Sequence, residues 1–350
     1  MTWQPDYRHF EQVMRNEKPA RLPLYEHLIN AGSMDQITGR PFSNLAGGDE
    51  ADRLEWLRRY CDFYREMTYD TVSIEYCVGG ILPDGGALIG ERPGPIQNRA
   101  DFEAYPWADL PRIFRERAYP TFDLLRQAMP AGMKGVGGVG NGVFEISEEL
   151  VGFEWLCYMQ ADDPELFADL YRRIGALLLA IWSEFLPRYG DLFAACRIGD
   201  DLGYKTGTLL APTAVLEHVI PQYRPIIRAI HAAGKPYLQH SCGCIFDVMG
   251  DWIEAGIDGK HSNEDAIAPF DDWIVRYGDR IALVGGIDTD RLCRMSPEDI
   301  TAFTVENGTR YRAMAKGFAL GSGNSIPEYV PPEGYRAMIE GVRRIRAAEA

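Results

Sequence analysis

One histidine and two cysteines lie close together directly after a short apolar segment, residues 236–238. They are His240, Cys242 and Cys244, and imidazole and thiolate are the ligands that Zn²⁺ prefers in proteins. If the apolar segment is a buried strand, the three side chains crowd its carboxyl end and could hold a metal ion. The alternative is a reduced, buried Cys242 beside a histidine that bonds the backbone. The spacing leaves both open, because no CxxC or HExxH pattern completes the site.

Two adjacent carboxylates, Asp200 and Asp201, end a second apolar segment, residues 193–199. Neighbouring residues on a strand point to opposite sides, so we expect only one of the two to face a site. Two crowded carboxylates push one pKa upward, which suits a general acid or a proton relay. The alternative for either residue is to accept hydrogen bonds from backbone donors in the following turn, residues 203–208. We expect one functional and one structural aspartate, and either assignment is open.

The elements that must position these residues alternate along the chain. Short apolar segments that end in glycine, proline or polar residues are typical of strands, and the segments between them have helical periodicity. Eight strands are expected, at residues 21–28, 69–77, 133–141, 193–203, 235–240, 256–262, 280–288 and 317–325. This alternation predicts an α/β protein with a single (β/α)₈ TIM barrel over residues 1–350, because no low-complexity linker or internal repeat divides the chain.

The connection after the second expected strand is unusually long. Residues 79–111 are rich in glycine and proline, and the sequence GGILPDGGALIG predicts a hairpin that turns at residues 83–85. A long excursion of this kind between a strand and a helix is typical of a functional loop.

In a TIM barrel the chemistry lies at the carboxyl ends of the strands, and polar residues follow nearly every expected strand here. With the two aspartates, Glu75 and Tyr76 are the candidate catalytic residues. The candidate substrate-binding residues are His27, Asn141, His261 and Asn324, and Glu264 is a further candidate metal ligand. By contrast, Asp288 and Ser296 are expected to cap helices. Arg197 and Lys205 could contact an anionic substrate, but a solvated role is favoured for both.

The composition excludes several classes of protein. The net charge is −15 and the basic residues are scattered, whereas nucleic acids and anionic membranes require a concentrated positive surface. No apolar run reaches the ~18 residues of a membrane span, and the polar N-terminus is unlike a signal peptide. Seven cysteines without framework spacing fit a reducing compartment. We expect a cytoplasmic protein with a small-molecule substrate, which could form a homodimer.

Six motifs together resemble the uroporphyrinogen decarboxylase superfamily: YPWADL, GDDLGYKTGTLLAP, HSCG, GIDGKHSNED, RIALVGGID and GSGNSIP. The resemblance spans most of the chain and implies a TIM barrel, in agreement with the strand count. It implies one of two chemistries. The true decarboxylases need no cofactor and bind a tetrapyrrole through arginines and an aspartate. The corrinoid-dependent methyltransferases hold zinc through an HxC motif and a later cysteine.

Two departures favour the methyltransferase-like branch. The region that resembles MRQAGR in decarboxylases reads LYEHLINAG here, so the arginines that would pair with the substrate carboxylates are missing. The expected fifth strand ends in HSCG, where decarboxylases resemble AKG.

The match to that branch is incomplete at one position. Its second cysteine lies in a segment like GCGIP, and Asn324 of GNSIP stands in that place. The resemblance therefore implies Zn²⁺ bound by His240, Cys242 and one of Glu264 or Cys244, with an open position for substrate. Such a metal would activate a thiol or alcohol that exchanges a methyl group with a corrinoid, which a partner corrinoid protein could carry. The alternatives are a cofactor-free decarboxylase that uses either aspartate, and a non-catalytic corrinoid or tetrapyrrole binder.

Overall fold

The computed structural model describes residues 3–88 and 92–349. Its centre is one parallel sheet in which each strand pairs with the next along the chain. The strands are β1 (Thr71–Cys77), β2 (Lys134–Gly140), β3 (Phe193–Gly199), β4 (Tyr237–His240), β5 (Gly259–His261), β6 (Ala282–Ile287) and β7 (Phe318–Ser322). Most of their residues are buried, as expected for parallel strands that are covered on both faces.

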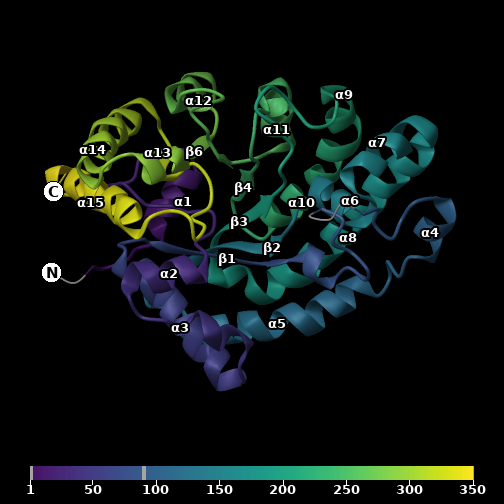
Figure 1. Ribbon diagram of the computed structural model, residues 1–350, viewed down its shortest axis with the longest axis horizontal. Coiled ribbons are helices and arrows are strands. Elements are labelled where there is room, and N and C mark those ends of the chain that lie inside the picture. Colours follow the sequence, from purple (N-terminus) through teal and green to yellow (C-terminus); the bar gives the residue numbers. More distant parts are fainter. Residues whose placement is uncertain (1–2, 89–91, 350) are drawn as a thin grey trace.

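Helices surround the curled sheet (Figure 1). They are α1 (Arg8–Met14), α2 (Ala31–Thr38), α3 (Glu50–Glu66), α4 (Arg99–Ala104), α5 (Leu110–Ala128), α6 (Val143–Val151), α7 (Phe153–Asp162), α8 (Pro164–Tyr189), α9 (Pro212–Ala214), α10 (Ile220–Ala232), α11 (Met249–Ala255), α12 (Phe270–Tyr277), α13 (Thr289–Arg294), α14 (Pro297–Met314) and α15 (Pro332–Glu349). In this outer layer α8 packs on α10, α3 on α5 and α14 on α15. The architecture is TIM-barrel-like, as predicted.

Local sequence explains where the longest helix begins and which face it buries. The Asp163 side chain accepts a hydrogen bond from Leu166 N over 2.9 Å, and Pro164 occupies the first helical position, where its missing N–H costs nothing. Apolar residues then recur at helical spacing and are buried: Leu166, Leu170, Ile174, Leu178 and Ile181. The buried side of α8 packs against α10, α6 and α7, and Trp182 and Phe185 near its end lie against Gly138 of β2.

The prediction of a first strand at residues 21–28 is wrong, because no regular strand forms there. The described residues contain seven strands. Residues 21–28 instead touch β7 through an isolated bridge between Leu24 and Leu320, and a second bridge joins Ile29 to Ile326. Tyr25 N donates to Leu320 O over 2.9 Å, and Leu320 N donates to Pro23 O over 3.0 Å. Proline has no N–H to donate, so Pro23 interrupts the regular ladder.

The predicted hairpin at residues 83–85 is also wrong for the part of the loop that is described. Residues 78–88 form the 3₁₀ helix η2 (Val78–Ile81) and turns, while residues 89 and 90 of the expected hairpin lie outside the described residues. Local bonds such as Gly85 N to Leu82 O replace cross-strand pairing. Farther along, Gly94 N and Ile96 N bond the last turn of α6, so the long loop packs on that helix.

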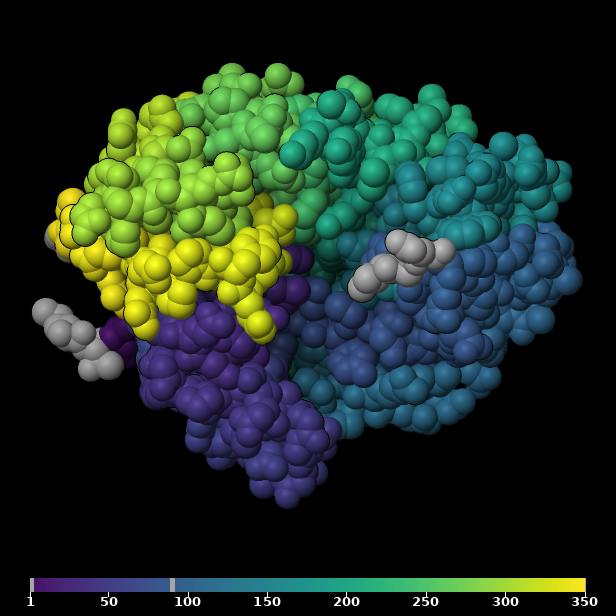
Figure 2. All heavy atoms as spheres, in the orientation of Figure 1, coloured from purple at the N-terminus to yellow at the C-terminus, as the bar shows by residue number. Residues whose placement is uncertain are grey.

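The inside of the sheet is apolar at one end and polar at the other. Side chains from α1, from the segment 21–28 and from the strands form a separate apolar cluster: Phe10, Val13, Met14, Tyr25, Val136, Ala195, Leu238, Ala282, Val284 and Ala319. Polar side chains follow toward the carboxyl ends of the strands, where a TIM-barrel-like protein carries its site. Figure 2 shows that the face seen in this view is hollowed near its centre. Within residues 3–88 and 92–349, none of the helices has the length and apolarity to cross a membrane.

Candidate metal centre

Three possible metal ligands of different chemistry meet beyond the ends of β3 and β4. They are Asp201, His240 and Cys242, whose ligand atoms all lie within 4.8 Å of one another. His240 Nε2 is 3.5 Å from Asp201 Oδ1 and 3.4 Å from Cys242 Sγ. Cys242 N donates a hydrogen bond to Asp201 Oδ1 over 2.8 Å. An oxygen, a nitrogen and a sulfur atom that could bind a metal therefore lie close together.

Two glycines allow the loops after β3 and β4 to approach so closely. Gly243 has a φ of 76°, and a Cβ there would lie 2.1 Å from the backbone of Gly203. The approach is fixed by Cys244 N, which donates to Tyr204 O over 2.6 Å. Because only glycine tolerates both the conformation and the contact, these residues hold Asp201 against the HSCG segment.

The two aspartates lie in different surroundings. Asp200 is buried and caps α6, since it accepts bonds from Phe144 N and Glu145 N, the latter over 2.9 Å, and from the Tyr223 hydroxyl over 2.6 Å. The donors come from α6 and α10 rather than from the turn after β3. Burial raises the pKa of Asp200 to about 6. Asp200 therefore anchors the start of α6, and its catalytic role stays a prediction.

Asp201 faces the cluster, and its pKa is shifted in the direction opposite to that of Asp200. Burial acts to raise its pKa, but the hydrogen bonds from His240 and from Cys242 N outweigh this effect and lower it to about 2. The pKa of the Cys242 thiol is shifted the other way, well above its usual value, because burial and the negative charge of Asp201 both disfavour the thiolate. Without a cation, the site holds a carboxylate beside a protonated thiol.

Histidines from three segments line the inner side of this cluster. His240 Nδ1 lies 2.7 Å from His261 Nδ1, and the His27 ring stacks on His240 with centroids 3.5 Å apart and planes 9° apart. Ring lone pairs lie in the ring plane, so stacked parallel rings do not direct their nitrogens at one ion. Possible ligand atoms of His27, His240 and His261 also lie within 4.8 Å of one another, but the stacking leaves His27 packed against His240 and poorly placed to share a metal with it.

Glu75 is held in a buried ion pair. Its Oε2 accepts from Arg197 over 2.6 Å, and the two side chains are 7% and 0% exposed. Arg197 also donates to Tyr25 Oη, His27 O and Ser73 Oγ. The solvated role expected for Arg197 is thus wrong. Alternation along β3 contained the signal, because Ala195, which belongs to the inner apolar cluster, lies on the same side as Arg197.

Other candidates from the sequence lie outside the ligand cluster. Tyr76 points toward the helices, where its ring meets Phe114 edge to face at 5.7 Å. Asn141 accepts from Gly79 N and donates to Glu145 Oε2, both over 2.9 Å, so it ties the long loop to α6. Their catalytic and substrate-binding roles stay predictions.

Asn324 reaches Cys242, whereas the two proposed substitutes for a third cysteine do not join the cluster. Asn324 Nδ2 donates to Cys242 Sγ over 3.2 Å. Among the described residues, the groups able to hold a metal include neither Glu264 nor Cys244. Asp201 lies in the cluster instead, and the role of Glu264 and Cys244 as ligands stays a prediction.

Sequence reasoning passed over two charged groups near this site, the buried Lys260 and the partly buried Glu145. Lys260 lies on β5 with its Nζ 3.8 Å from the Trp273 ring centroid and bonded to Ser262 O, and burial lowers its pKa to about 7. Glu145 lies at the start of α6, where burial and then Asp200 raise its pKa well above the usual value. Both lie next to residues that were singled out, but neither ends a strand, so the search at strand ends missed them.

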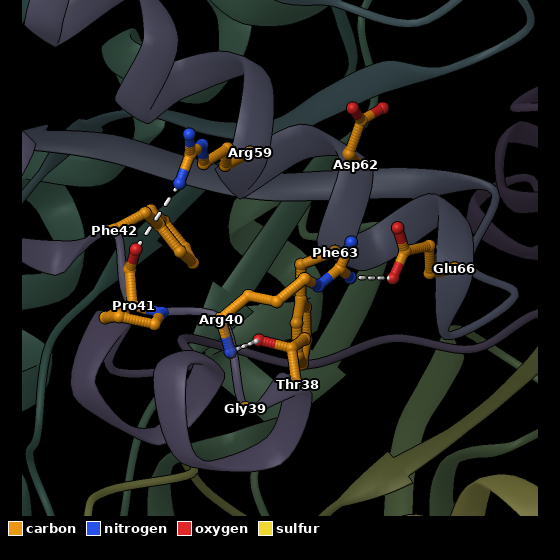
Figure 3. A pocket seen from close by; sticks show the side chains of 9 residues that line it. All are labelled: Thr38, Gly39, Arg40, Pro41, Phe42, Arg59, Asp62, Phe63 and Glu66. Atoms are coloured by element: carbon orange, nitrogen blue, oxygen red, sulfur yellow. Dashed lines mark hydrogen bonds and ion pairs between the residues drawn. The ribbon is translucent and has the colours of Figure 1, made fainter.

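A separate pocket of about 510 Å³ lies between α2 and α3, in the outer helical layer (Figure 3). Its charged side chains are paired locally, since Arg40 bonds Glu66 and Arg59 donates to Pro41 O over 3.3 Å. It contains none of the site residues predicted from the sequence.

Asp288 and Ser296 were expected to cap helices, and both do so. Asp288 accepts from Asp290 N over 2.8 Å at the start of α13, and Ser296 Oγ accepts from Asp299 N over 3.2 Å at the start of α14. Both are therefore structural, as predicted.

Similarity to known proteins, in fold and in sequence, identifies the family of the chain. The chain is similar in fold to a methyltransferase from Methanosarcina mazei, with a TM-score of 0.75, 14% identity and coverage of 97% of this chain and 99% of that one. A B12-independent methionine synthase from a Shewanella species follows, with a TM-score of 0.50, 11% identity and coverage of 85% and 89%. Curated proteins give no match. The uroporphyrinogen decarboxylase (URO-D) profile matches residues 84–345, which confirms the resemblance seen in the motifs, so the chain belongs to the URO-D family.

Proposed function

We propose that this URO-D family member is a methyltransferase that binds Zn²⁺ through Asp201, His240 and Cys242. The observation that carries the proposal is the meeting of these three donors within 4.8 Å at the carboxyl ends of β3 and β4. The branch features of the sequence and the similar fold of the Methanosarcina mazei methyltransferase also support it.

The residues present fit a catalytic zinc ion. One nitrogen, one sulfur and one oxygen donor match the ligands of catalytic sites, which keep a fourth position for substrate. The carboxylate and a thiolate together balance the two positive charges of the ion. A cation here would also remove the penalty that burial and Asp201 place on ionisation of the Cys242 thiol. When bound, zinc would lower the pKa of a substrate thiol or alcohol and so supply a nucleophile at neutral pH.

The chain's own residues orient this site. Cys242 N fixes the Asp201 carboxylate, and Asn324 donates to Cys242 Sγ. Behind them, Arg197 donates to His27 O and holds the segment that stacks on His240. These contacts restrict the donors to one arrangement before a substrate arrives, which reduces the cost of reorganisation.

The proposed reaction exchanges a methyl group between a small thiol or alcohol and a corrinoid, which a corrinoid protein could present. Decarboxylation of a tetrapyrrole is less well supported, because substrate carboxylates need free cations and Arg197 is buried against Glu75. A non-catalytic tetrapyrrole binder would not require the three converging donors. A cytoplasmic location and a homodimer remain predictions from the sequence.

Metal content and activity test the proposal together. Protein expressed with added zinc should bind about one equivalent, the usual content of a catalytic zinc site. Cys242→Ala should lose the metal and the methyl-transfer activity with a methylated corrinoid and a thiol. Cys244→Ala is the matched control, two residues away and outside the cluster, and should keep both. A metal-free wild type, or an active Cys242→Ala, would contradict the proposal.

A further inference from the structure

A second pocket, of about 780 Å³, lies at the amino ends of the first two strands. Thr68 and Ala131 line it, and β1 and β2 begin shortly after them, at Thr71 and Lys134. The candidate metal centre lies beyond the carboxyl ends of β3 and β4, so the two sites are at opposite edges of the sheet. Small-molecule sites commonly have volumes of about 300–1,000 Å³. The pocket is therefore large enough for a ligand and is separate from the proposed catalytic site.

Arginines supply most of the charge around this pocket. Three of them line it: Arg65, Arg343 and Arg346. Arg65 is paired, since its Nη2 lies 2.7 Å from Asp62 Oδ1. The carboxylate that lines the pocket, Glu66, bonds Arg40 on the side of the other pocket, between α2 and α3 (Figure 3). We call the cavity of about 780 Å³ the arginine pocket.

The other two arginines come from α15 and contact only neutral acceptors. Arg343 and Arg346 are spaced i, i+3, so they lie on the same face of the helix. Arg343 is exposed and donates to Glu66 O over 3.0 Å. Arg346 donates to Leu22 O over 2.7 Å and to Thr68 O over 2.8 Å. Within residues 3–88 and 92–349, neither arginine forms an ion pair, so two positive charges at the pocket have no carboxylate in direct contact.

Arg346 is the more deeply placed of the two. The centroid of the Trp3 ring, which also lines the pocket, is 4.5 Å from Arg346 Cζ and 4.1 Å from Arg21 Cζ. The buried Asp70 bonds Arg21 rather than Arg346. Burial lowers the pKa of Arg346 from 12.5 to about 10, and the charge of Asp70 offsets only part of this effect. Nη2 of Arg346 has no hydrogen-bond partner among the described residues, and a nearby anion would offset the cost of this buried cation.

We propose that the arginine pocket binds a small oxyanion, the phosphate or carboxylate group of a metabolite, through Arg343 and Arg346. Guanidinium groups bind both kinds of group through charge-assisted hydrogen bonds. The chain as a whole carries a net charge of −15, so attraction of an anion must come from these local charges. The inference is independent of the proposed function, because the pocket shares no residue with the candidate metal centre.

Isothermal titration with inorganic phosphate, and separately with succinate, tests the proposal in a chloride buffer. The wild type should bind at least one of the two anions, and the tighter of the two identifies the group that the pocket prefers. Arg343→Gln should weaken this binding by about tenfold or more, the effect of one lost charge-assisted hydrogen bond. Arg344→Gln is the matched control. It makes the same change of charge at the next residue, but Arg344 pairs with Glu340 over 3.1 Å and does not line the pocket.

Thermal unfolding gives a second readout, because a ligand that binds only the folded protein raises its Tm. The bound anion should raise the Tm of the wild type and of Arg344→Gln, and should raise that of Arg343→Gln much less. A purely structural role for Arg343 predicts a lower Tm without anion but the same rise when the anion is added. A wild type that binds neither anion at millimolar concentration, or equal weakening in Arg343→Gln and Arg344→Gln, would overturn the inference.

Discussion

Asn324 donates a hydrogen bond to the sulfur of Cys242 over 3.2 Å. The family motif suggested a second cysteine at this position, and the Asn324 amide contacts the sulfur of Cys242 instead. A donor to sulfur stabilises its ionised form and withdraws some charge from it. The candidate ligand cluster therefore contains one sulfur, from Cys242, and the carboxylate of Asp201. The related methyltransferases have an HxC motif and a second cysteine.

Loss of the amide should therefore weaken the metal site. Asn324→Ala removes a hydrogen bond to a charged group, worth about 1.5–3 kcal/mol, and zinc affinity should fall by roughly tenfold or more. Chelator competition measures the change. Asn307→Ala, which removes a buried asparagine from α14, is the control and should leave zinc affinity unchanged. Equal affinity in Asn324→Ala and the wild type would show that the contact does not support the metal.

The approach of the two glycines should be essential for the site. Gly243→Ala would bring a Cβ to 2.1 Å from Gly203 and strain a residue with a φ of 76°, so the loops must separate and Asp201 must move away from Cys242. We expect zinc affinity to fall by at least about tenfold, as for other disturbed ligand environments. Gly207→Ala is a control in the facing loop, which carries Gly203, because a Cβ at Gly207 meets nothing within 4 Å. Metal binding by Gly243→Ala at the level of Gly207→Ala would contradict the account.

The buried pair of Arg197 and Glu75 predicts strongly coupled effects on stability. Arg197→Met leaves the buried Glu75 carboxylate without its positive partner. Glu75→Gln leaves the buried Arg197 guanidinium without its negative partner. Each should lower the free energy of unfolding by about 3–5 kcal/mol. The double variant should recover a large part of the loss, as urea denaturation would measure. Additive losses in the double variant would argue that the pair is not the source of the effect.

Glu26 should make stability depend on pH. Burial raises its pKa from 4.5 to about 8, so the folded protein keeps this proton over a range in which the unfolded chain has lost it. Folding therefore takes up a proton between these values, and stability falls as pH rises toward 8. Between pH 6 and 8 the loss from this group should be roughly 2 kcal/mol.

Glu26→Gln cannot titrate and isolates this contribution from that of other groups. The difference in unfolding free energy between Glu26→Gln and the wild type should change across this range in favour of the variant. A difference that stays constant from pH 6 to 8 would show that Glu26 ionises normally in the folded protein.

The sequence predicted where the candidate site lies better than it predicted which residues form it. His240 and Cys242 were expected at a strand end and lie there, since an apolar run before polar residues is a local signal. The proposed choice of Asp201 over Glu264 or Cys244 depends on the close approach of two loops at Gly203 and Gly243, which no local pattern encodes.

Burial inside the barrel was also hard to foresee for charged residues. Arg197 was expected in solvent because charge usually indicates exposure, but its partner Glu75 comes from a strand more than a hundred positions earlier. The family motifs, by contrast, extend along the chain and identified the fold and family despite the irregular segment at Pro23.

X-ray absorption at the zinc edge of the loaded protein tests the central claim most directly, because it counts sulfur ligands. Binding by Asp201, His240 and Cys242 predicts one sulfur at about 2.3 Å, with the other ligands nitrogen or oxygen at about 2.0–2.2 Å. In Cys242→Ala the sulfur signal should disappear, and in Cys244→Ala it should remain. Two sulfur ligands in the wild type, or one that survives in Cys242→Ala, would contradict this site.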